Sequence, residues 1–206
     1  SAELIEEGAD YDAATEVADR FVREKGMMLV HSTNNREVIA GAATLSLEIV
    51  LEEPRLEALV IAVGGGSQAV GALTAARALR TDLRVYGVQA ERAAAIHDSW
   101  HAGQPIMKSS ADTFADGLAT RQAYEMTFGA LREGLAGFVA VTESEIASAL
   151  RLLVRTTHNL AEGAGAAGLA GLIKLREQLA GQRVAVVISG SNIDDATLRR
   201  VLNKEM

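Results

Sequence analysis

Cysteine is absent from this sequence of 206 residues, and proline occurs only twice. Without cysteine the chain can form no disulfide, thiolate nucleophile or cysteine-ligated zinc site, and a reducing compartment, the cytoplasm, fits it best. No apolar run reaches the roughly 18 to 20 residues of a membrane span. The acidic segment 1–7 also lacks the basic and apolar parts of a signal peptide. We therefore expect no membrane and no export.

Basic charge is also scarce. The chain carries 20 Lys and Arg against 27 Asp and Glu, a formal net charge of −7, and no local basic cluster offsets it. Such a chain repels a phosphate backbone, so we expect no nucleic-acid partner. Hydrophobic residues make up 49% and charged residues 23%, which excludes a disordered or collagen-like chain. The length allows one substantial core, and one domain or one and a fraction is expected.

Short apolar runs alternate with helical patterns along the chain. Strands are expected at 27–31, 59–63, 83–88, 138–141 and 183–188. Helices are expected at 10–26, about 37–52, 67–78, 92–102, 143–158 and 163–179, and after residue 192. Because strands that are apolar throughout must be covered on both faces, the pattern predicts an α/β fold of three layers with a mainly parallel sheet.

A glycine-rich turn follows the expected strand 59–63. Gly64, Gly65 and Gly66 precede Ser67 and a helix, so several backbone N–H groups stand unshielded at a helix N-terminus, which favours an anion. Close packing of strand and helix is the alternative role, but one small turn rarely needs three glycines. Ligands of parallel sheets bind at the carboxyl ends of strands, where both 64–68 and 189–192 fall. The loop therefore predicts a phosphate cradle.

Other phosphate and nucleophile motifs fit this loop less well. No Gly-Lys-Ser/Thr follows it, and Gln89 stands where a dinucleotide site would place an acidic residue. Ser67 lies in a Gly-Gly-Ser-Gln-Ala segment similar to a nucleophile elbow, but the last glycine of that motif is missing. A phosphate-binding serine is favoured over a nucleophile. The histidines that could serve such a nucleophile as a base are His31, His97, His101 and His158.

Five motifs occur in order along the chain. They are VIAGAATLSLE at 38–48, VGGGSQAVG at 63–71, ADGLA at 115–119, EGAGAA at 162–167 and SGSNID at 189–194. Their order and spacing resemble those of the threonine/serine dehydratases, pyridoxal-phosphate enzymes of the tryptophan-synthase-β fold, also called fold type II. The resemblance covers the chain from about Asp10 to Asp195.

The resemblance implies a role for the loop and for one serine. In that family, main-chain N–H groups of the glycine loop bind the cofactor phosphate, and a serine after the last strand contacts the pyridine nitrogen. Because a neutral hydroxyl stabilises a protonated ring less than a carboxylate does, β-elimination is favoured over transamination. The residues that match these cofactor-binding positions are Gly64, Gly65, Gly66, Ser67, Gln68 and Ser189.

The reaction implied by the resemblance is dehydration and deamination of threonine, serine or a related β-hydroxy amino acid. Its products would be a 2-oxo acid and ammonia, and its cofactor would be pyridoxal phosphate. The protein is expected to form a homo-oligomer. Racemase-like members hold a divalent metal through carboxylates at positions that match Gln89 and Ala95. An amide and a methyl group do not replace these ligands, so we expect no metal site. Glu91 and Asp98 are expected to be solvated groups on a helix surface.

The lysine that binds the cofactor as a Schiff base in this family lies in a Ser-Phe-Lys-like segment, well before the part that this sequence resembles. None of Lys25, Lys108, Lys174 and Lys204 matches that segment. We therefore expect a C-terminal two-thirds of such an enzyme, inactive alone and with its catalytic residue unassigned. Residues 1–32 would end the small domain, and 33–206 would form the large, cofactor-binding domain without its N-terminal portion. The alternative is a non-catalytic module that binds a phosphorylated ligand.

Overall fold

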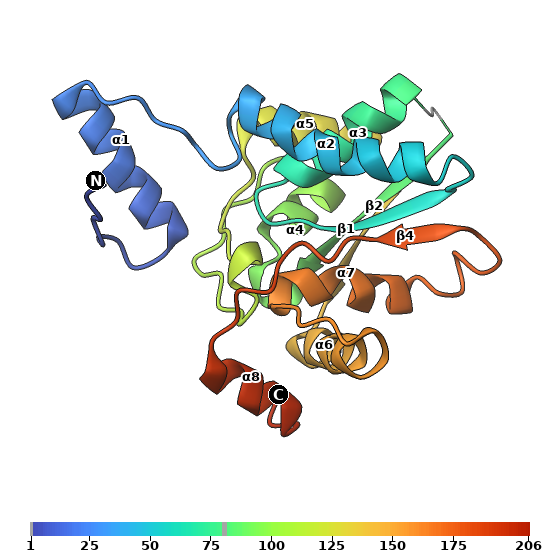
Figure 1. Ribbon diagram of the computed structural model, residues 1–206. Coiled ribbons are helices and arrows are strands. Elements are labelled where there is room, and N and C mark those ends of the chain that lie inside the picture. Colours follow the sequence, from blue (N-terminus) through green and yellow to red (C-terminus); the bar gives the residue numbers. More distant parts are fainter. Residues whose placement is uncertain (1, 80–81) are drawn as a thin grey trace.

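A computed structural model describes residues 2–79 and 82–206 (Figure 1). Ser1, which begins the predicted small-domain segment, lies outside the described residues. The sheet consists of β1 (Ala58–Ala62), β2 (Arg84–Ala90), β3 (Gly137–Val141) and β4 (Val184–Val186). These strands are parallel and lie in the order β3-β2-β1-β4. The expected parallel α/β fold is confirmed.

Both faces of the sheet are covered, because side chains of a strand alternate between its faces. In β1, Val60 packs into one core and Leu59 and Ile61 into the other, and all three are fully buried. Each such side chain contributes roughly 1.5–3 kcal/mol on burial. On one side lie α2 (Arg36–Glu52), α3 (Ser67–Leu79), α4 (Ala95–Ala102) and α5 (Glu125–Gly134). On the other side lie α6 (Glu143–Thr157) and α7 (Gly163–Lys174), which gives the predicted three layers.

Local signals in the sequence set the ends of several helices. α1 (Tyr11–Lys25) begins after Asp10, whose carboxylate accepts a hydrogen bond from the Ala13 N–H at 2.8 Å, and ends at Gly26 with φ of 63°. In α6, Thr142 and Glu145 form a capping box. α8 (Asp195–Leu202) begins after Asp194, which accepts hydrogen bonds from two backbone N–H groups. Such caps satisfy N–H groups that have no partner within the helix.

The strand predicted at 27–31 is wrong. This segment is extended but forms no strand, and its apolar residues Met28 and Val30 are 86% and 66% exposed. A strand needs a neighbour for its hydrogen bonds, and no described strand pairs with this segment. The strand predicted at 183–188 is shorter than expected, and β4 is half-buried because it lies at the sheet edge.

The helices also depart from the prediction at three places. α5 was not predicted, although its buried residues Thr127 and Leu131 lie one turn apart. The helix predicted at 92–102 begins at Ala95, after a 3₁₀ turn at Glu91–Ala93. The helix predicted at 163–179 ends at Lys174 and continues as turns.

α1 lies apart from the layers around the sheet and is joined to α2 by an extended segment (Figure 1). The predicted division of the chain after residue 32 stays a prediction. Among the described residues, no helix is long and apolar enough to cross a bilayer.

Candidate functional site

The carboxyl ends of β1 and β4 meet at one cavity. The two strands are neighbours and parallel, so the loop after β1 and Ser189 after β4 emerge at the same edge of the sheet. The cavity has a volume of about 200 Å³. All six residues predicted to bind the cofactor line it, together with Thr33, Ala62, Gly117, Leu118, Glu162 and Ala164. The structure therefore brings Gly64, Gly65, Gly66, Ser67, Gln68 and Ser189 together.

The N–H groups of residues 64–68 have no hydrogen-bond partner among the described residues. Their carbonyl groups are held instead. The Thr127 hydroxyl donates to the Gly65 oxygen at 2.9 Å, and the Thr120 hydroxyl donates to the Gly64 oxygen at 3.4 Å. A trans peptide unit is planar, with its C=O and the following N–H pointing in opposite directions. Thr120 therefore orients the N–H of Gly65, and Thr127 orients that of Gly66.

Each of the three glycines is required by its surroundings. A Cβ on Gly64 would overlap the Gly117 carbonyl oxygen, and a Cβ on Gly65 would overlap the Thr33 side chain. Gly66 has φ of 98°, a conformation that side chains rarely adopt, and a Cβ there would come within 2.9 Å of Leu131. Close packing and free N–H groups, treated as alternatives above, therefore both apply to this loop.

The electrostatics of the cavity favour an anion at the glycine loop. The loop leads into the N-terminus of α3, a helix of 13 residues whose dipole and free N–H groups attract negative charge. A carboxylate, Glu162, lines the same cavity at the start of α7 and lies against Gly190, next to Ser189. Neither Glu162 nor the two supporting threonines was predicted as a site residue. Glu162 stands in one of the five motifs, but the threonines carry no local signal.

The arrangement of a serine hydrolase does not form around Ser67. No histidine is among the described residues that line the cavity. The nitrogen Nδ1 of His31 accepts hydrogen bonds from the backbone N–H groups of Thr33 and Asn34, at 3.0 and 2.9 Å. The Ser67 position at the first turn of α3 fits a group that contacts an anion.

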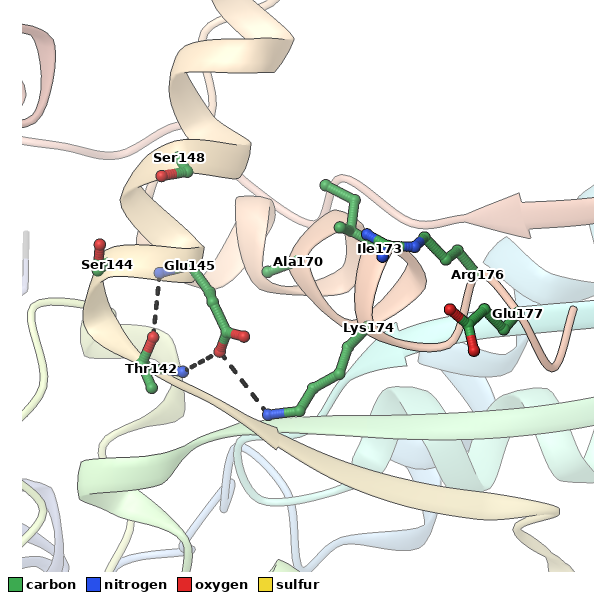
Figure 2. Close-up of a pocket in the computed structure, with 9 residues that line it drawn as sticks. All are labelled: Thr142, Ser144, Glu145, Ser148, Ala170, Ile173, Lys174, Arg176 and Glu177. Carbon is green, nitrogen blue, oxygen red and sulfur yellow. Dashed lines mark hydrogen bonds and ion pairs between the residues drawn. The ribbon is translucent and has the colours of Figure 1, made fainter.

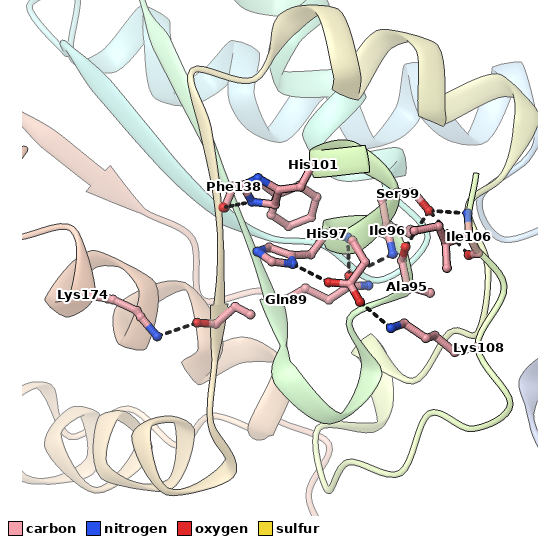
Figure 3. Close-up of polar contacts among 12 residues, drawn as sticks. Gln89, Ala95, Ile96, His97, Ser99, His101, Ile106, Lys108, Phe138 and Lys174 are labelled. Atoms are coloured by element: carbon pink, nitrogen blue, oxygen red, sulfur yellow. Dashed lines mark hydrogen bonds and ion pairs between the residues drawn. The ribbon is translucent and has the colours of Figure 1, made fainter. Parts of the chain in front are cut away.

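Gln89 lies at the end of β2 and is fully buried. Its side-chain oxygen accepts hydrogen bonds from the N–H groups of Ile96 and His97, at 3.1 and 2.9 Å (Figure 3). These belong to the first turn of α4, which has no side-chain cap of its own. Gln89 thus caps this helix from the neighbouring strand, while its Nε2 has no described partner.

Asp98 is partly exposed on the surface of α4, but it is also paired, which the sequence did not predict. Its carboxylate pairs with Lys108 and lies 2.9 Å from Nδ1 of His97. Partial burial opposes the charged form, but the hydrogen bonds from Lys108 and His97 outweigh it and lower the pKa of Asp98. Glu91 is exposed as predicted. This cluster fastens α4 to the loop that follows it.

A second hollow, of about 490 Å³, lies between α6 and α7 (Figure 2). Two of its charged groups already have partners. Glu145 accepts from the Thr142 N–H at 2.7 Å and lies 3.8 Å from Nζ of Lys174, which donates to the Ala140 carbonyl oxygen at 2.8 Å. Of the part of the chain that the structure describes, neither Lys174 nor any other lysine lines the cavity at the glycine loop.

Residues 1–190 match a family model described as pyridoxal-phosphate dependent enzyme. An L-threonine ammonia-lyase from Thermotoga maritima is 36% identical over 203 residues, which are 98% of this chain and 50% of the relative. A phenylserine dehydratase from Ralstonia pickettii is 33% identical over 190 residues, 92% of this chain and 58% of the relative. The processed form of threonine deaminase isoform 2 from Solanum lycopersicum has a TM-score of 0.90 and 28% identity, over 97% of this chain and 55% of that structure.

The chain thus spans half, or somewhat more, of the length of the relatives it matches. Its fold is that of the fold type II enzymes, as the superposition with a threonine deaminase shows. The match includes the glycine loop and Ser189, the residues that the structure gathers at one cavity. The chain belongs to the family of pyridoxal-phosphate-dependent enzymes.

Proposed function

We propose that this chain is the cofactor-binding part of an ammonia-lyase that eliminates the hydroxyl of a β-hydroxy amino acid as water, after which water hydrolyses the released enamine. The products would be a 2-oxo acid and ammonia. One observation carries the proposal: residues 64–68, whose N–H groups have no partner among the described residues, and Ser189 line one cavity in a chain of a pyridoxal-phosphate family.

The glycine loop fits a phosphate group on structural grounds. Its N–H groups are free, its carbonyls are held by Thr120 and Thr127, and a Cβ on any of the three glycines would meet neighbouring atoms. In the proposed complex, the N–H groups of residues 64–68 donate to phosphate oxygens. The α3 dipole adds attraction for the dianion. No arginine or lysine is needed in such a cradle, and none of the described ones (residues 2–79 and 82–206) lines this cavity.

Ser189 would place its hydroxyl at the pyridine nitrogen. Bound pyridoxal phosphate supplies the electron sink that eases loss of the α-proton and of the β-hydroxyl. With serine rather than a carboxylate at the nitrogen, the sink is weaker, which favours elimination over transamination. Glu162, beside Gly190, is the one carboxylate among the described residues that line the cavity.

The substrate class follows from the relatives. Threonine and phenylserine, named for two of them, both carry a hydroxyl on Cβ and differ in the group beyond it. We propose threonine, serine or a close analogue as the substrate. The lysine that binds the cofactor would lie in the part of the relatives that this chain does not cover. This chain alone would therefore bind phosphate without turnover.

We further propose a domain division, a cellular compartment and an oligomeric state for the protein. Residues 1–32 would belong to a small domain and 33–206 to the large domain, in keeping with the position of α1 away from the sheet (Figure 1). The absence of cysteine favours a reducing compartment such as the cytoplasm. A homo-oligomer is the expected assembly, which size-exclusion chromatography with light scattering would test.

A chimera tests the proposed reaction. The part of the Thermotoga maritima relative that precedes the match is fused ahead of residue 2, and 2-oxo acid formation from L-threonine and L-serine is followed with pyridoxal phosphate present. We expect turnover by the chimera and none by the 206-residue chain. A Gly65→Ala chimera serves as the inactive control.

Two results would contradict the proposal. A folded chimera that binds pyridoxal phosphate but forms no 2-oxo acid would favour the non-catalytic module. Turnover by the 206-residue chain alone, with borohydride trapping of the cofactor on one of its lysines, would show that the catalytic lysine lies within it.

A further inference from the structure

Asp12 is the one residue of α1 that is buried, with 6% of its surface exposed. A buried carboxylate is costly unless hydrogen bonds compensate it. Here one carboxylate oxygen accepts a hydrogen bond from the backbone N–H of Arg121 at 2.9 Å. The other oxygen accepts from Nε2 of Gln122 at 3.0 Å and from the Tyr124 hydroxyl at 3.3 Å. These three hydrogen bonds, from residues 121, 122 and 124, bind the start of α1 to the segment 121–124.

Two of the groups around Asp12, the Tyr124 hydroxyl and the Arg121 guanidinium, can only donate hydrogen bonds to it or pair with its charge. Burial, and then the charge of Asp12, raise the pKa of Tyr124, so its hydroxyl stays protonated and donates. The Arg121 guanidinium lies 3.7 Å from Asp12 and 2.9 Å from Asp10, the residue that caps α1. The first turn of α1 is therefore attached at two carboxylates, while its remaining length extends away from the sheet (Figure 1).

The segment that Asp12 binds is the one that orients the glycine loop. Thr120 precedes it and donates to the Gly64 oxygen, and Thr127 follows it and donates to the Gly65 oxygen. Asp12 thus holds the middle of a stretch whose two ends fix two successive peptide units of the loop. A shift of residues 121–124 would move both threonines and turn the N–H groups of Gly65 and Gly66.

We propose that Asp12 is a positioning residue that couples the placement of α1 to the phosphate-binding geometry of residues 64–66. This inference rests on the proposed phosphate role of the loop. It gives α1 a role in cofactor binding, although no residue of α1 lines the cavity. If α1 were displaced, Asp12 would be solvated, residues 121–124 would lose their anchor, and the loop would bind phosphate less tightly.

The test compares Asp12→Ala with Glu16→Gln, a change at an exposed acidic residue of the same helix. The probes are pyridoxine 5′-phosphate and pyridoxine, which lack the aldehyde and so bond to no lysine. We expect Asp12→Ala to weaken pyridoxine 5′-phosphate about tenfold and to leave pyridoxine unchanged, while Glu16→Gln changes neither. Amide chemical shifts of Gly65 and Gly66 in the free chain should change in Asp12→Ala only.

A second variant covers the case in which Asp12→Ala loosens the whole fold. Tyr124→Phe keeps the ring that packs against His31, with ring centroids 5.2 Å apart, and removes one donor to Asp12. We expect about a threefold loss of pyridoxine 5′-phosphate affinity. Thermal unfolding of each variant shows whether the sheet is intact. A purely structural role would lower the melting temperature without changing the ratio of the two affinities.

The outcomes separate this inference from the proposed function. If the unaltered chain binds pyridoxine 5′-phosphate with shifts at residues 64–68, and folded Asp12→Ala binds it equally, the coupling is wrong and the phosphate role stands. If the unaltered chain does not bind it at this loop, the phosphate role falls and the coupling falls with it. Loss of phosphate affinity together with changed Gly65 and Gly66 amide shifts supports both.

Discussion

The Thr127 hydroxyl donates a hydrogen bond to the Gly65 carbonyl oxygen at 2.9 Å, and this contact aims the N–H of Gly66 away from α5. Thr127 is fully buried, so its hydroxyl depends on partners within the protein. The contact ties a helix on one side of the sheet to the loop that we propose binds phosphate.

Replacing Thr127 by valine should therefore weaken phosphate binding. Valine has the same shape but no hydroxyl, and it leaves the Gly65 oxygen without a donor, at a cost of about 1–2 kcal/mol. We expect a roughly tenfold rise in the dissociation constant of pyridoxine 5′-phosphate, measured by calorimetry. Thr127→Ser, which keeps the hydroxyl, should bind nearly as the unaltered chain does. Equal affinity for the valine and serine variants would show that this bond does not orient the loop.

Gly65→Ala should abolish phosphate binding, because the added methyl group overlaps the Thr33 side chain and forces the loop to move. Gly129→Ala is the matched control. Gly129 lies in α5, is exposed and has nothing within 4 Å of an added Cβ. Alanine there should raise the free energy of unfolding by about 1 kcal/mol and leave binding unchanged. Retained phosphate binding by a folded Gly65→Ala chain would be incompatible with the proposed cradle.

Ser189→Ala should separate ring contact from phosphate contact. The loop is untouched, so the affinity for inorganic phosphate should not change, whereas that for pyridoxine 5′-phosphate should fall about fivefold because a hydrogen bond to the ring nitrogen is lost. Ser110→Ala, at an exposed position away from the cavity, is the control. If both ligands weaken equally, Ser189 shapes the loop and does not contact the ring.

Gln89→Met should destabilise the fold by about 2 kcal/mol. Methionine fills a similar volume but leaves the N–H of Ile96 buried without an acceptor. Urea unfolding measures the change, and Gln104→Met, at an exposed loop position, should have almost no effect. An unaltered midpoint for Gln89→Met would mean that α4 finds another cap.

The ion pair of Asp98 predicts a pH dependence. The pKa of this carboxyl is lowered in the folded chain, so its stabilising contribution is present above the ordinary carboxyl pKa and is lost as the pH falls through the lowered value. The difference in unfolding free energy between the unaltered chain and Asp98→Asn should be largest above about pH 5 and shrink below about pH 4. Asp19→Asn in α1 should show no such trend. A difference that stays constant down to acidic pH would contradict the pairing.

Patterns confined to one stretch of chain predicted most of the fold. The apolar run at 59–63 predicted β1, and Asp10 and Gly26 predicted both ends of α1, since each depends only on neighbouring residues. The glycine loop and Ser189 could be placed at one edge because parallel strands end on the same side of a sheet.

What could not be predicted depends on distant partners. The run 27–31 has strand composition, but a strand exists only beside another, and none of the described strands lies there. Thr120 and Thr127 look like ordinary polar residues until the fold sets them against Gly64 and Gly65. Asp98 gains its partner from a lysine ten residues further along, which helical spacing does not reveal.

The most direct test of the phosphate cradle is a ¹H–¹⁵N NMR titration of the 206-residue chain with pyridoxine 5′-phosphate. The amides of Gly64, Gly65, Gly66, Ser67 and Gln68 should shift together and saturate with one dissociation constant, and inorganic phosphate should shift the same set. Saturable binding that moves other amides and leaves these five in place would contradict the account.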